Sequence, residues 1–356
     1  MTEGFLSSNN SLRVFSYNLG APTRYRIDHH IEQAQYVGVA TRRGALYTSL
    51  LLPTSAFYLH RVPLTSRTLL LVLAAKLRRV PIVFDSDDLV WDPRERAYNY
   101  LDRHYTPQVM EQILKTTRRM HVMMRLADAF VFSTPYLAQR AALDFRQPSY
   151  VNANALSQEQ VALSQAARQS SVPHGSNVVI GYFSGQSKVH DEDMAMIGPA
   201  LRDTLDRYQH VQLRIVGGLT LPPELAASSY RARIEQHAAV DWRALPAQIA
   251  QVDINIAPLV DNPQRRAKSA VKYLEAAAVG VPTIASQLDP YADIVHGETG
   301  LLARTSDEWR GSLSQLIEHT ALRQRIGTAA HADTLAHHTT AARAPNFAAI
   351  IEQIVR

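Results

Sequence analysis

Lys268, Ser269, Lys272 and Glu275 form a short polar group whose side chains suit a nucleoside diphosphate. Two ammonium groups and a hydroxyl beside the start of a helix can bind phosphate oxygens. Two helical turns after Lys268, the carboxylate of Glu275 can accept hydrogen bonds from both hydroxyls of a ribose. The residues leave a simpler interpretation open, in which the lysines are a surface pair and Glu275 forms an ion pair with Lys272.

The elements around this group are those of an α/β protein. Apolar residues between Val271 and Val279 recur at the spacing of one buried helix face, and Gly280 followed by Pro282 predicts where the helix ends. Apolar, β-branched runs at residues 252–259 and 282–286 predict parallel strands before and after it. Ligands bind at the carboxyl ends of such strands, so the positive end of the helix dipole should lie at a binding site.

A second charged group, Asp85, Asp87 and Asp88, follows the apolar run at residues 81–84. Like charges this close together are unfavourable unless they are paired. One interpretation is a divalent cation site that would hold a diphosphate. The other is structural, with the carboxylates capping the next helix and pairing with nearby arginines.

The composition is that of a globular protein large enough for two domains. The chain has 356 residues, of which 46% are hydrophobic, and apolar runs typical of strands alternate with helical patterns in both halves. The absence of cysteine excludes disulfides and a thiolate nucleophile, and it is compatible with a reducing compartment. We find no secretory segment and no apolar run of about 18 residues, so we expect a cytoplasmic protein.

The charge is concentrated in the first half of the chain. Residues 1–172 hold 20 Lys and Arg against 13 Asp and Glu, a balance of +7, whereas residues 173–356 have a balance of −2. The densest basic clusters are Lys76–Arg79 and Lys115–Arg119. This asymmetry favours an anionic partner for the first half, either an anionic membrane surface or a phosphorylated acceptor, although a solvated basic face is equally compatible. No nucleic-acid-binding motif is present, so we expect no nucleic acid partner.

The run from Lys268 to Pro282 reads Lys-Ser-x-x-Lys-x-Leu-Glu-Ala-x-Ala-x-Gly-x-Pro, which resembles the donor-site helix of retaining GT-B glycosyltransferases (group 1, family 4-like). Their motif is Glu-x7-Glu, and here its first position is Ala267 while its second is Glu275. The resemblance implies a GT-B fold, with two Rossmann-like domains whose parallel sheets face a central cleft. It places an acceptor-binding domain at residues 1–172, a nucleotide-sugar-binding domain at 173–340, and a last helix at 341–356 that packs back on the first domain.

The resemblance also extends to the first domain. The run Pro-x-x-Phe-Asp-x-Asp-Asp-Leu, residues 81–89, is similar to one in a GT-B subgroup whose members have a His-Asp pair facing the acceptor. By that comparison Asp87 takes the place of the histidine and Asp88 follows it, which makes both catalytic candidates. A Tyr-Arg pair opens the first helix of the relatives and resembles Tyr25-Arg26. The loop carrying it should face the cleft, so Arg24 and Arg26 become candidates for acceptor contact.

In the second domain, the loop after the first strand resembles the Ser-Gly-x-x-x-His-x-x-Asp loop of the same subgroup, with one residue inserted. Gly185, Lys188 and His190 are the donor-binding candidates of this loop. Together with Lys268, Ser269, Lys272 and Glu275 they would bind a nucleotide-sugar.

The resemblance therefore implies an enzyme that moves a sugar from a nucleotide-sugar to a glycan, a lipid-linked acceptor or a small molecule, with retention of configuration. The donor is a co-substrate, and we expect no other cofactor and no metal, because the helix N-terminus and basic side chains offset the diphosphate charge. Ala267 in place of glutamate keeps an alternative open, a catalytically silent GT-B domain that binds a sugar nucleotide or glycan as a partner subunit. A GT-B epimerase is a third interpretation.

Overall fold

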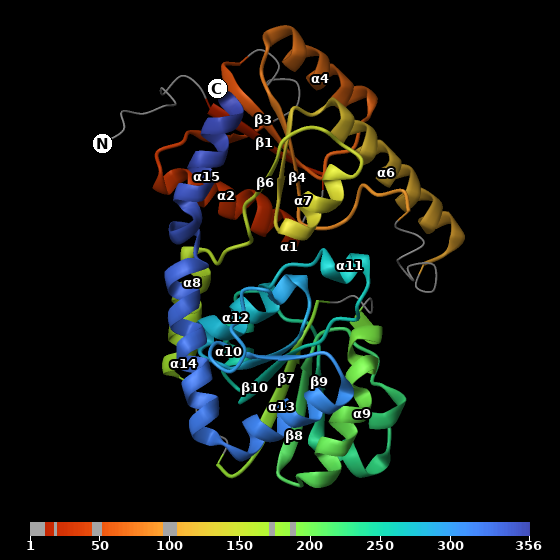
Figure 1. Ribbon diagram of the computed structural model, residues 1–356, viewed down its shortest axis with the longest axis vertical. Helices are drawn as coiled ribbons and strands as arrows, with labels where there is room; N and C mark the ends of the chain where they lie inside the picture. The colour runs from red at the N-terminus through yellow and green to blue at the C-terminus, as the bar shows by residue number, and fades with distance from the viewer. Residues whose placement is uncertain (1–10, 18–19, 45–51, 95–104, 171–174, 186–189) are drawn as a thin grey trace. The chain divides into compact units, whose positions relative to one another are not determined.

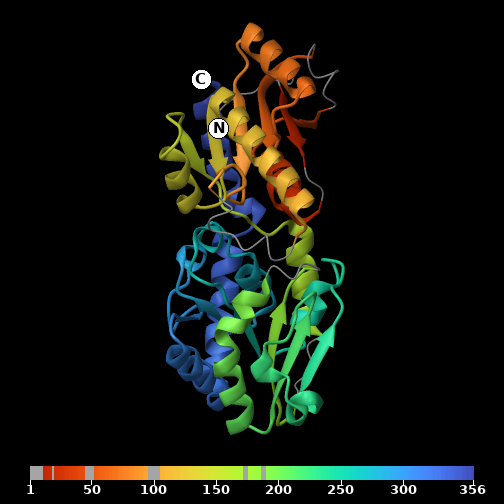
Figure 2. The ribbon, with the colours of Figure 1, turned by 90° about the vertical axis from the view of Figure 1, so that its right-hand side faces the viewer.

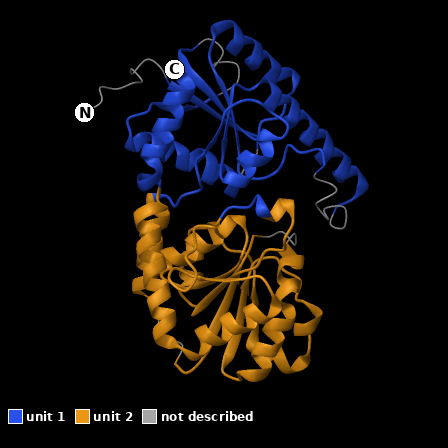
Figure 3. Ribbon diagram, in the orientation of Figure 1, with its two compact units in different colours: residues 1–157, 266–269, 340–356 blue, residues 158–265, 270–339 orange. Residues whose placement is uncertain are grey.

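The computed structural model describes residues 11–17, 20–44, 52–94, 105–170, 175–185 and 190–356 (Figures 1 and 2). The chain divides into two compact units, each built on its own parallel sheet (Figure 3). Unit 1 comprises residues 1–157, 266–269 and 340–356, and unit 2 comprises residues 158–265 and 270–339.

The strands of unit 1 are β1 (Ser11–Ser16), β2 (Thr41–Arg43), β3 (Thr54–His60), β4 (Ile82–Ser86), β5 (Ala129–Phe132) and β6 (Ser149–Val151). They form one sheet in the order β2-β1-β3-β4-β5-β6, in which every pairing is parallel. The central strands β3 and β4 are buried along their whole length, as expected for strands that are covered on both faces.

Helices cover both faces of this sheet. Phe57 and Leu59 of β3 pack with one set of helices, and Ala56 and Tyr58 with the other, because successive side chains of a strand point to opposite faces. On the first face lie α4 (Ser66–Arg78), α6 (Pro107–Leu126) and α7 (Pro135–Ala142). On the second lie α2 (His29–Tyr36) and α15 (Thr340–Val355), with α2 preceded by α1 (Ala21–Thr23) and the π-helical turn η1 (Arg24–Asp28).

The strands of unit 2 are β7 (Val178–Phe183), β8 (Val211–Val216), β9 (Ile234–His237), β10 (Ile254–Ala257), β11 (Thr283–Ser286) and β12 (Leu301–Ala303). They pair in parallel in the order β12-β11-β10-β7-β8-β9. Ile180 and Tyr182 of β7 pack on one face, and Val179 and Phe183 on the other.

The helices of unit 2 complete its two outer layers. On the face of Ile180 lie α9 (Asp191–Arg207) and α13 (Ser306–Glu318). On the face of Val179 lie α8 (Gln158–Gln169), α10 (Leu245–Ile249) and α12 (Val271–Val279). The remaining helices are α11 (Pro263–Arg266) and α14 (Thr320–His337), of which α14 packs against α12.

The two helix-covered parallel sheets confirm the predicted α/β class. The division of the chain differs from the predicted boundary at residues 172/173, because the first segment of unit 1 ends at Ser157 and α8 belongs to unit 2. The buried Ala167 of α8 packs in the same core as Ile249 and Val279. The helix α15 is part of unit 1.

Each sheet has one point where the strand order reverses. In unit 1 the chain runs from β1 to β2 on one side and then to β3 on the other. In unit 2, β7 lies between β8, the next strand in sequence, and β10. In open α/β sheets the carboxyl ends of the strands at such a reversal flank the ligand site. The residues that follow β1 and β3, and those that follow β7 and β10, are therefore the first places to look for function.

Candidate functional site

At the carboxyl edge of the unit 1 sheet, Asp87 and Asp88 share cationic partners. The Arg61 guanidinium lies 2.6 Å from Asp87 Oδ1 and 2.7 Å from Asp88 Oδ2. The Lys268 ammonium lies 2.6 Å from the other carboxylate oxygen of Asp88, Oδ1. Two carboxylates and two cations thus form a partly exposed cluster in which the formal charges balance. The structural interpretation of the aspartates, pairing with basic residues, accounts for their closeness.

His60 links Asp87 to the end of β1. Its Nε2 lies 3.2 Å from Asp87 Oδ1, and its Nδ1 lies 2.9 Å from Ser16 Oγ, which in turn lies 2.9 Å from Thr23 Oγ1. An ionised carboxylate only accepts hydrogen bonds, so Nε2 carries the proton and Nδ1 accepts from the Ser16 hydroxyl. These residues meet because β1, β3 and β4 are adjacent parallel strands whose carboxyl ends share one edge.

Arg61 has an unusual backbone conformation. Its φ is +52°, a left-handed value that residues with a side chain rarely adopt. The residue directly follows β3, and its N–H donates to Asp85 O at 2.9 Å. Such a conformation costs about 1–3 kcal/mol and persists where the surroundings hold it, often at functional sites. Here the ion pairs of its guanidinium with Asp87 and Asp88 stabilise the conformation.

The charges around the two aspartates keep both ionised. Burial raises the pKa of Asp87, but the Arg61 charge and the His60 hydrogen bond outweigh burial and hold that pKa far below its ordinary value. Burial likewise raises the pKa of Asp88, while Lys268 and Arg61 lower it by more, so its pKa is also below the usual one. Carboxylates of such low basicity accept hydrogen bonds well but are poor bases at neutral pH.

Asp85, the third member of the aspartate group, is part of the core. Arg26 Nε and Nη2 donate to its two oxygens at 3.0 and 2.6 Å, and the Tyr58 hydroxyl donates to Oδ2 at 2.6 Å. Arg26 Nη1 donates to the Asn152 carbonyl at 2.6 Å and to Asn154 Oδ1 at 3.1 Å. The side chains of Arg26 and Asp85 are both 0% exposed.

This burial corrects the interpretation of Arg26 as an acceptor contact. Its guanidinium is hydrogen-bonded to the fully buried carboxylate of Asp85, so Arg26 stabilises the carboxyl edge of the sheet from inside unit 1. Arg24 is half-buried, and its guanidinium carbon lies 5.2 Å from the centroid of the Tyr25 ring. Arg24 therefore stays a candidate for acceptor contact.

In unit 2, α12 follows β10 as predicted, and Gly280 ends it with a φ of +88°. The Lys272 ammonium donates to the Tyr182 hydroxyl at 2.9 Å and lies 4.1 Å from the centroid of that ring. Tyr182 is on β7, so this contact ties the Lys272 side chain to a strand where the order of the sheet reverses. Glu275 lies one turn further along and is half-buried, in a helix that is otherwise mostly buried.

Lys268 and Ser269 belong to unit 1, although they directly precede α12. Ser269 Oγ accepts a hydrogen bond from Asn154 Nδ2 at 3.0 Å, and Lys268 pairs with Asp88. Ala267 is fully buried in the hydrophobic cluster of unit 1 that includes Phe57 and anchors this segment there. The predicted donor group is thus divided between the two units.

The loop after β7 is shaped by a close backbone approach. A Cβ at Gly217, where φ is +118°, would lie 2.2 Å from Ser184 O, so this position requires glycine. The Gly218 N–H donates to Gly185 O at 2.8 Å, which fixes the predicted donor-binding Gly185. Lys188, another predicted member of this site, lies outside the described residues.

His190 lies at the start of α9 and is held by a buried carboxylate. Its Nδ1 lies 2.8 Å from Asp193 Oδ2, and Asp193 Oδ1 accepts from the Val260 N–H and from Arg265 Nε, both at 2.9 Å. Asp193 therefore ties the His190 side chain to the loop after β10. His190 is thus tied through Asp193 to the loop after β10, and Lys272 to β7, the two strands that flank the reversal of the sheet order.

A metal site at the aspartate group finds no geometric support. Over the ranges that the structure describes, no three His, Asp and Glu side chains are grouped as cation ligands. Each of the three aspartates instead has an arginine partner within 2.7 Å. Within the same ranges, no helix is both long and apolar enough to cross a bilayer.

The sequence and the fold can now be compared with known proteins. Residues 197–349, which include α12 and the loop after β10, match the family model described as glycosyl transferase-like. No curated protein matches the sequence of this chain. The family match thus rests on the second half of the chain.

Solved structures share the whole architecture. The Anabaena protein HepE in complex with UDP-glucose is 15% identical with a TM-score of 0.63, over 97% of this chain and 100% of that one. A glycosyltransferase from Rickettsia africae is 14% identical with a TM-score of 0.63, over 98% and 99%. A UDP-forming α,α-trehalose-phosphate synthase from Burkholderia xenovorans is 12% identical with a TM-score of 0.57, over 93% of this chain and 79% of that one. The chain has the fold of the GT-B glycosyltransferases.

Sequence reasoning missed His60, Arg61 and Tyr182 as partners of the candidate residues. His60-Arg61 follows the apolar residues Phe57, Tyr58 and Leu59, as Asp85 follows the apolar run 81–84, so two apolar runs that both end in charged residues were a usable signal. Tyr182 carried no such signal, because an aromatic residue within an apolar strand is ordinarily a core residue.

Proposed function

We propose that this protein is a glycosyltransferase that takes a sugar from a nucleotide-sugar bound by unit 2 and transfers it to an acceptor bound by unit 1. The observation that carries the proposal is the position of Lys272 and Glu275. Both lie on α12, which follows β10 at the reversal point of a parallel sheet, within the stretch that matches the glycosyl transferase-like model. The Anabaena protein of the same fold binds UDP-glucose, which favours a UDP-sugar as donor.

In the donor site, Glu275 accepts hydrogen bonds from the ribose hydroxyls, and Lys272 contributes positive charge beside the diphosphate. The backbone of Gly185, the His190 side chain, Lys188 and Ser269 are its further members. Lys268 supplies a second cation to the diphosphate. Because basic side chains and the N-terminus of α12 offset the negative charge, the donor needs no divalent cation and the enzyme needs no cofactor.

In the acceptor site, Asp87 accepts a hydrogen bond from the reacting hydroxyl and orients it. Its low pKa makes it a weak base, so the departing phosphate takes the proton instead. The bond between the sugar C1 and the diphosphate oxygen breaks, a new bond from C1 to the acceptor oxygen forms on the same face, and configuration is retained. Asp88 and Arg61 hold Asp87 in place, and Arg24 is a further contact for the acceptor.

The test measures donor binding in matched variants. Titration calorimetry with UDP and with a panel of nucleotide-sugars should give one preferred donor, and Glu275→Ala should weaken it by about 1.5–3 kcal/mol, the value of a hydrogen bond to a charged group. Glu298→Ala, which removes an exposed carboxylate elsewhere in unit 2, is the control and should leave the affinity unchanged. Equal donor affinities in both variants and the wild type would show that Glu275 does not bind the donor, and would favour the simpler interpretation of an ion pair with Lys272.

A second candidate function, a sugar-nucleotide-binding subunit without transferase activity, is favoured by one observation. The position where the family has the first glutamate of its motif is Ala267, and this residue is fully buried among apolar side chains. Release of UDP from the preferred UDP-sugar, measured with and without candidate acceptors, separates the two functions. Tight donor binding with no UDP release under any condition would establish the silent domain.

A further inference from the structure

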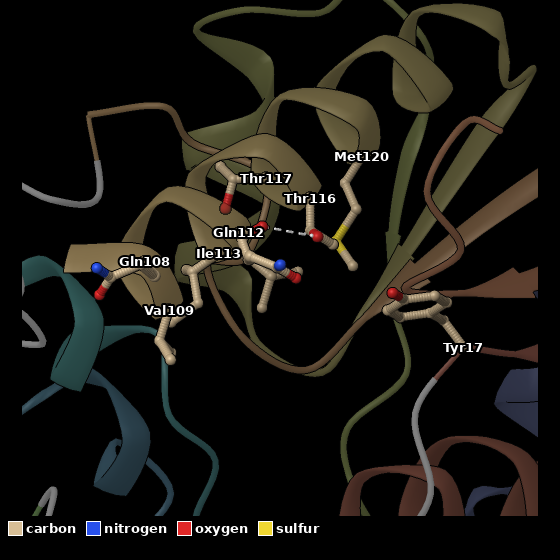
Figure 4. Close-up of a pocket in the computed structure, with 9 residues that line it drawn as sticks. Tyr17, Gln108, Val109, Gln112, Ile113, Thr116, Thr117 and Met120 are labelled. Atoms are coloured by element: carbon tan, nitrogen blue, oxygen red, sulfur yellow. Dashed lines mark hydrogen bonds between the residues drawn. The ribbon is translucent and has the colours of Figure 1, made fainter. Parts of the chain in front are cut away.

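Unit 1 contains a pocket that the proposed roles do not use. It has a volume of about 550 Å³ and lies between α6 and the segments that follow β1 and β4 (Figure 4). Figure 4 shows the Tyr17 ring facing the side chains of α6 across this space. Its described lining residues are Tyr17, Val90, Gln108, Val109, Gln112, Ile113, Thr116, Thr117 and Met120.

The described lining residues are all uncharged, in a half of the chain whose balance is +7. Val109, Ile113, Thr116 and Met120 recur at helical spacing and form one stripe along α6. Three charged residues of the same helix, Glu111, Lys115 and Arg118, line a separate pocket of about 670 Å³ with Tyr105, Pro107, Met110 and Leu114. The two pockets on α6 thus differ in charge.

Apolar surface in the uncharged pocket is accessible to a ligand. Val109 is 42% exposed and Tyr17 is 55% exposed, values that are high for an aliphatic and an aromatic side chain in a pocket. The Thr116 hydroxyl donates to Gln112 O at 2.9 Å, so this polar atom already has a partner. The volume lies in the usual range for small-molecule sites, which is about 300–1,000 Å³.

The pocket adjoins the aspartate cluster. Tyr17 directly follows Ser16, whose hydroxyl contacts His60, and the Tyr17 N–H donates to His60 O at 3.2 Å. On the opposite side, the Val90 N–H donates to Asp88 O at 2.9 Å. Two of its walls are thus extensions of the segments that carry Ser16 and Asp88. The pocket therefore adjoins the segment that carries Asp87, the carboxylate proposed to hold the acceptor hydroxyl.

We infer that this pocket binds an uncharged, mainly apolar aglycone of the acceptor, an alkyl chain or an aryl group attached to the hydroxyl-bearing part. The assignment of this group to an acceptor rests on the proposed function, whereas the binding of an apolar group in the pocket does not depend on it. A charged or purely hydrophilic acceptor would leave the exposed faces of Tyr17 and Val109 in water. An apolar group covers them and gains affinity for each methylene removed from water.

The probes are alkyl β-glucosides with methyl, butyl, hexyl and octyl groups, and phenyl β-glucoside, all below their micelle concentrations. Affinity, measured by calorimetry, should rise with chain length by up to about fourfold per methylene until the pocket is full. Comparing the affinities of the phenyl and hexyl glucosides shows whether the pocket prefers an aryl or an alkyl aglycone.

The matched variants are Val109→Asp and Val122→Asp. Both valines are on α6 and almost equally exposed, 42% and 43%, but only Val109 is among the pocket residues. Val109→Asp should weaken octyl glucoside at least tenfold, Val122→Asp should not, and both should bind UDP as the wild type does. Affinity that does not depend on chain length, or equal losses in the two variants, overturns the inference. Chain-length-dependent binding without any sugar transfer would refute the proposed function and leave the pocket assignment standing.

Discussion

The buried pair of Arg26 and Asp85 allows a sharp prediction about what holds the sheet edge of unit 1. Both side chains are fully buried, and two N–H groups of the guanidinium meet the two carboxylate oxygens at 3.0 and 2.6 Å. Asp85→Asn keeps the shape but leaves a guanidinium charge without its counter-charge. Removing one partner of a buried pair costs about 3–5 kcal/mol, because the remaining charge stays desolvated.

The same reasoning predicts the behaviour of the other single variant and of the double variant. Arg26→Met should cost a similar amount, since it leaves the buried Asp85 carboxylate with a hydrogen bond from the Tyr58 hydroxyl at 2.6 Å but without its counter-charge. Arg26→Met combined with Asp85→Leu should cost much less than the sum of the single changes, because an apolar pair leaves no buried charge.

Urea unfolding measures these costs through the transition of unit 1. With a slope of about 2–3 kcal/mol/M, a loss of about 3–5 kcal/mol should lower the midpoint of each single variant by about 1–2.5 M. Lys76→Met is the control, because Lys76 and Asp128 form an ion pair in the same unit that is 47% and 41% exposed, and its loss should cost less than about 1 kcal/mol. The reasoning would be refuted if the single variants lost less unfolding free energy than the control, or if the double variant lost as much as the two single variants together.

Three further outcomes are expected. Burial lowers the pKa of His29 to about 4, so stability that is present above the unfolded pKa of about 6.5 should be lost as the pH falls toward 4. The amide of His29→Asn can replace the Nδ1 bond to the Ala155 carbonyl, so this variant should lose less stability over that pH range, as measured by urea unfolding. Transfer should survive EDTA, and restoration of a chelated enzyme by Mg²⁺ or Mn²⁺ would contradict the metal-independent proposal. We propose peripheral contact with anionic membranes through the clusters Lys76–Arg79 and Lys115–Arg119, so the protein should pellet with anionic liposomes at low salt. Exchanging the arginines of both clusters for Gln should abolish pelleting and leave the affinity for UDP unchanged.

Those parts of the fold that depend on local patterns were predictable from the sequence. The helix α12 was predictable because its apolar spacing, the glycine at its end and the following proline all indicate the same boundaries. The short edge strands β2 and β9 were not, because Thr41–Arg43 and Ile234–His237 are polar or charged runs. Such residues are common on edge strands, where they discourage pairing with other chains, and they look like loops in a sequence.

The candidate site was predictable in its residue types but not in its pairings. The three aspartates were singled out correctly as charges that need partners, yet the sequence could not assign Asp85 to the core and its neighbours to the edge. That assignment depends on Arg26, an arginine distant in sequence whose burial no local pattern reveals. Arg61 reaches Asp87 only through a left-handed backbone, which is rare for arginine and so could not be predicted.

The division of the donor group between the units gives Lys268 two competing anions, if it binds a diphosphate as we propose. In its present ion pair with Asp88 the two side chains are 30% and 21% exposed, so both charges still reach solvent. A diphosphate carries more charge and accepts shorter, charge-assisted hydrogen bonds, so exchange of Asp88 for the donor is favourable. Asp88 keeps its bond to Arg61 through the exchange. Lys268 can therefore respond to the donor without leaving a carboxylate unpaired beside the acceptor hydroxyl.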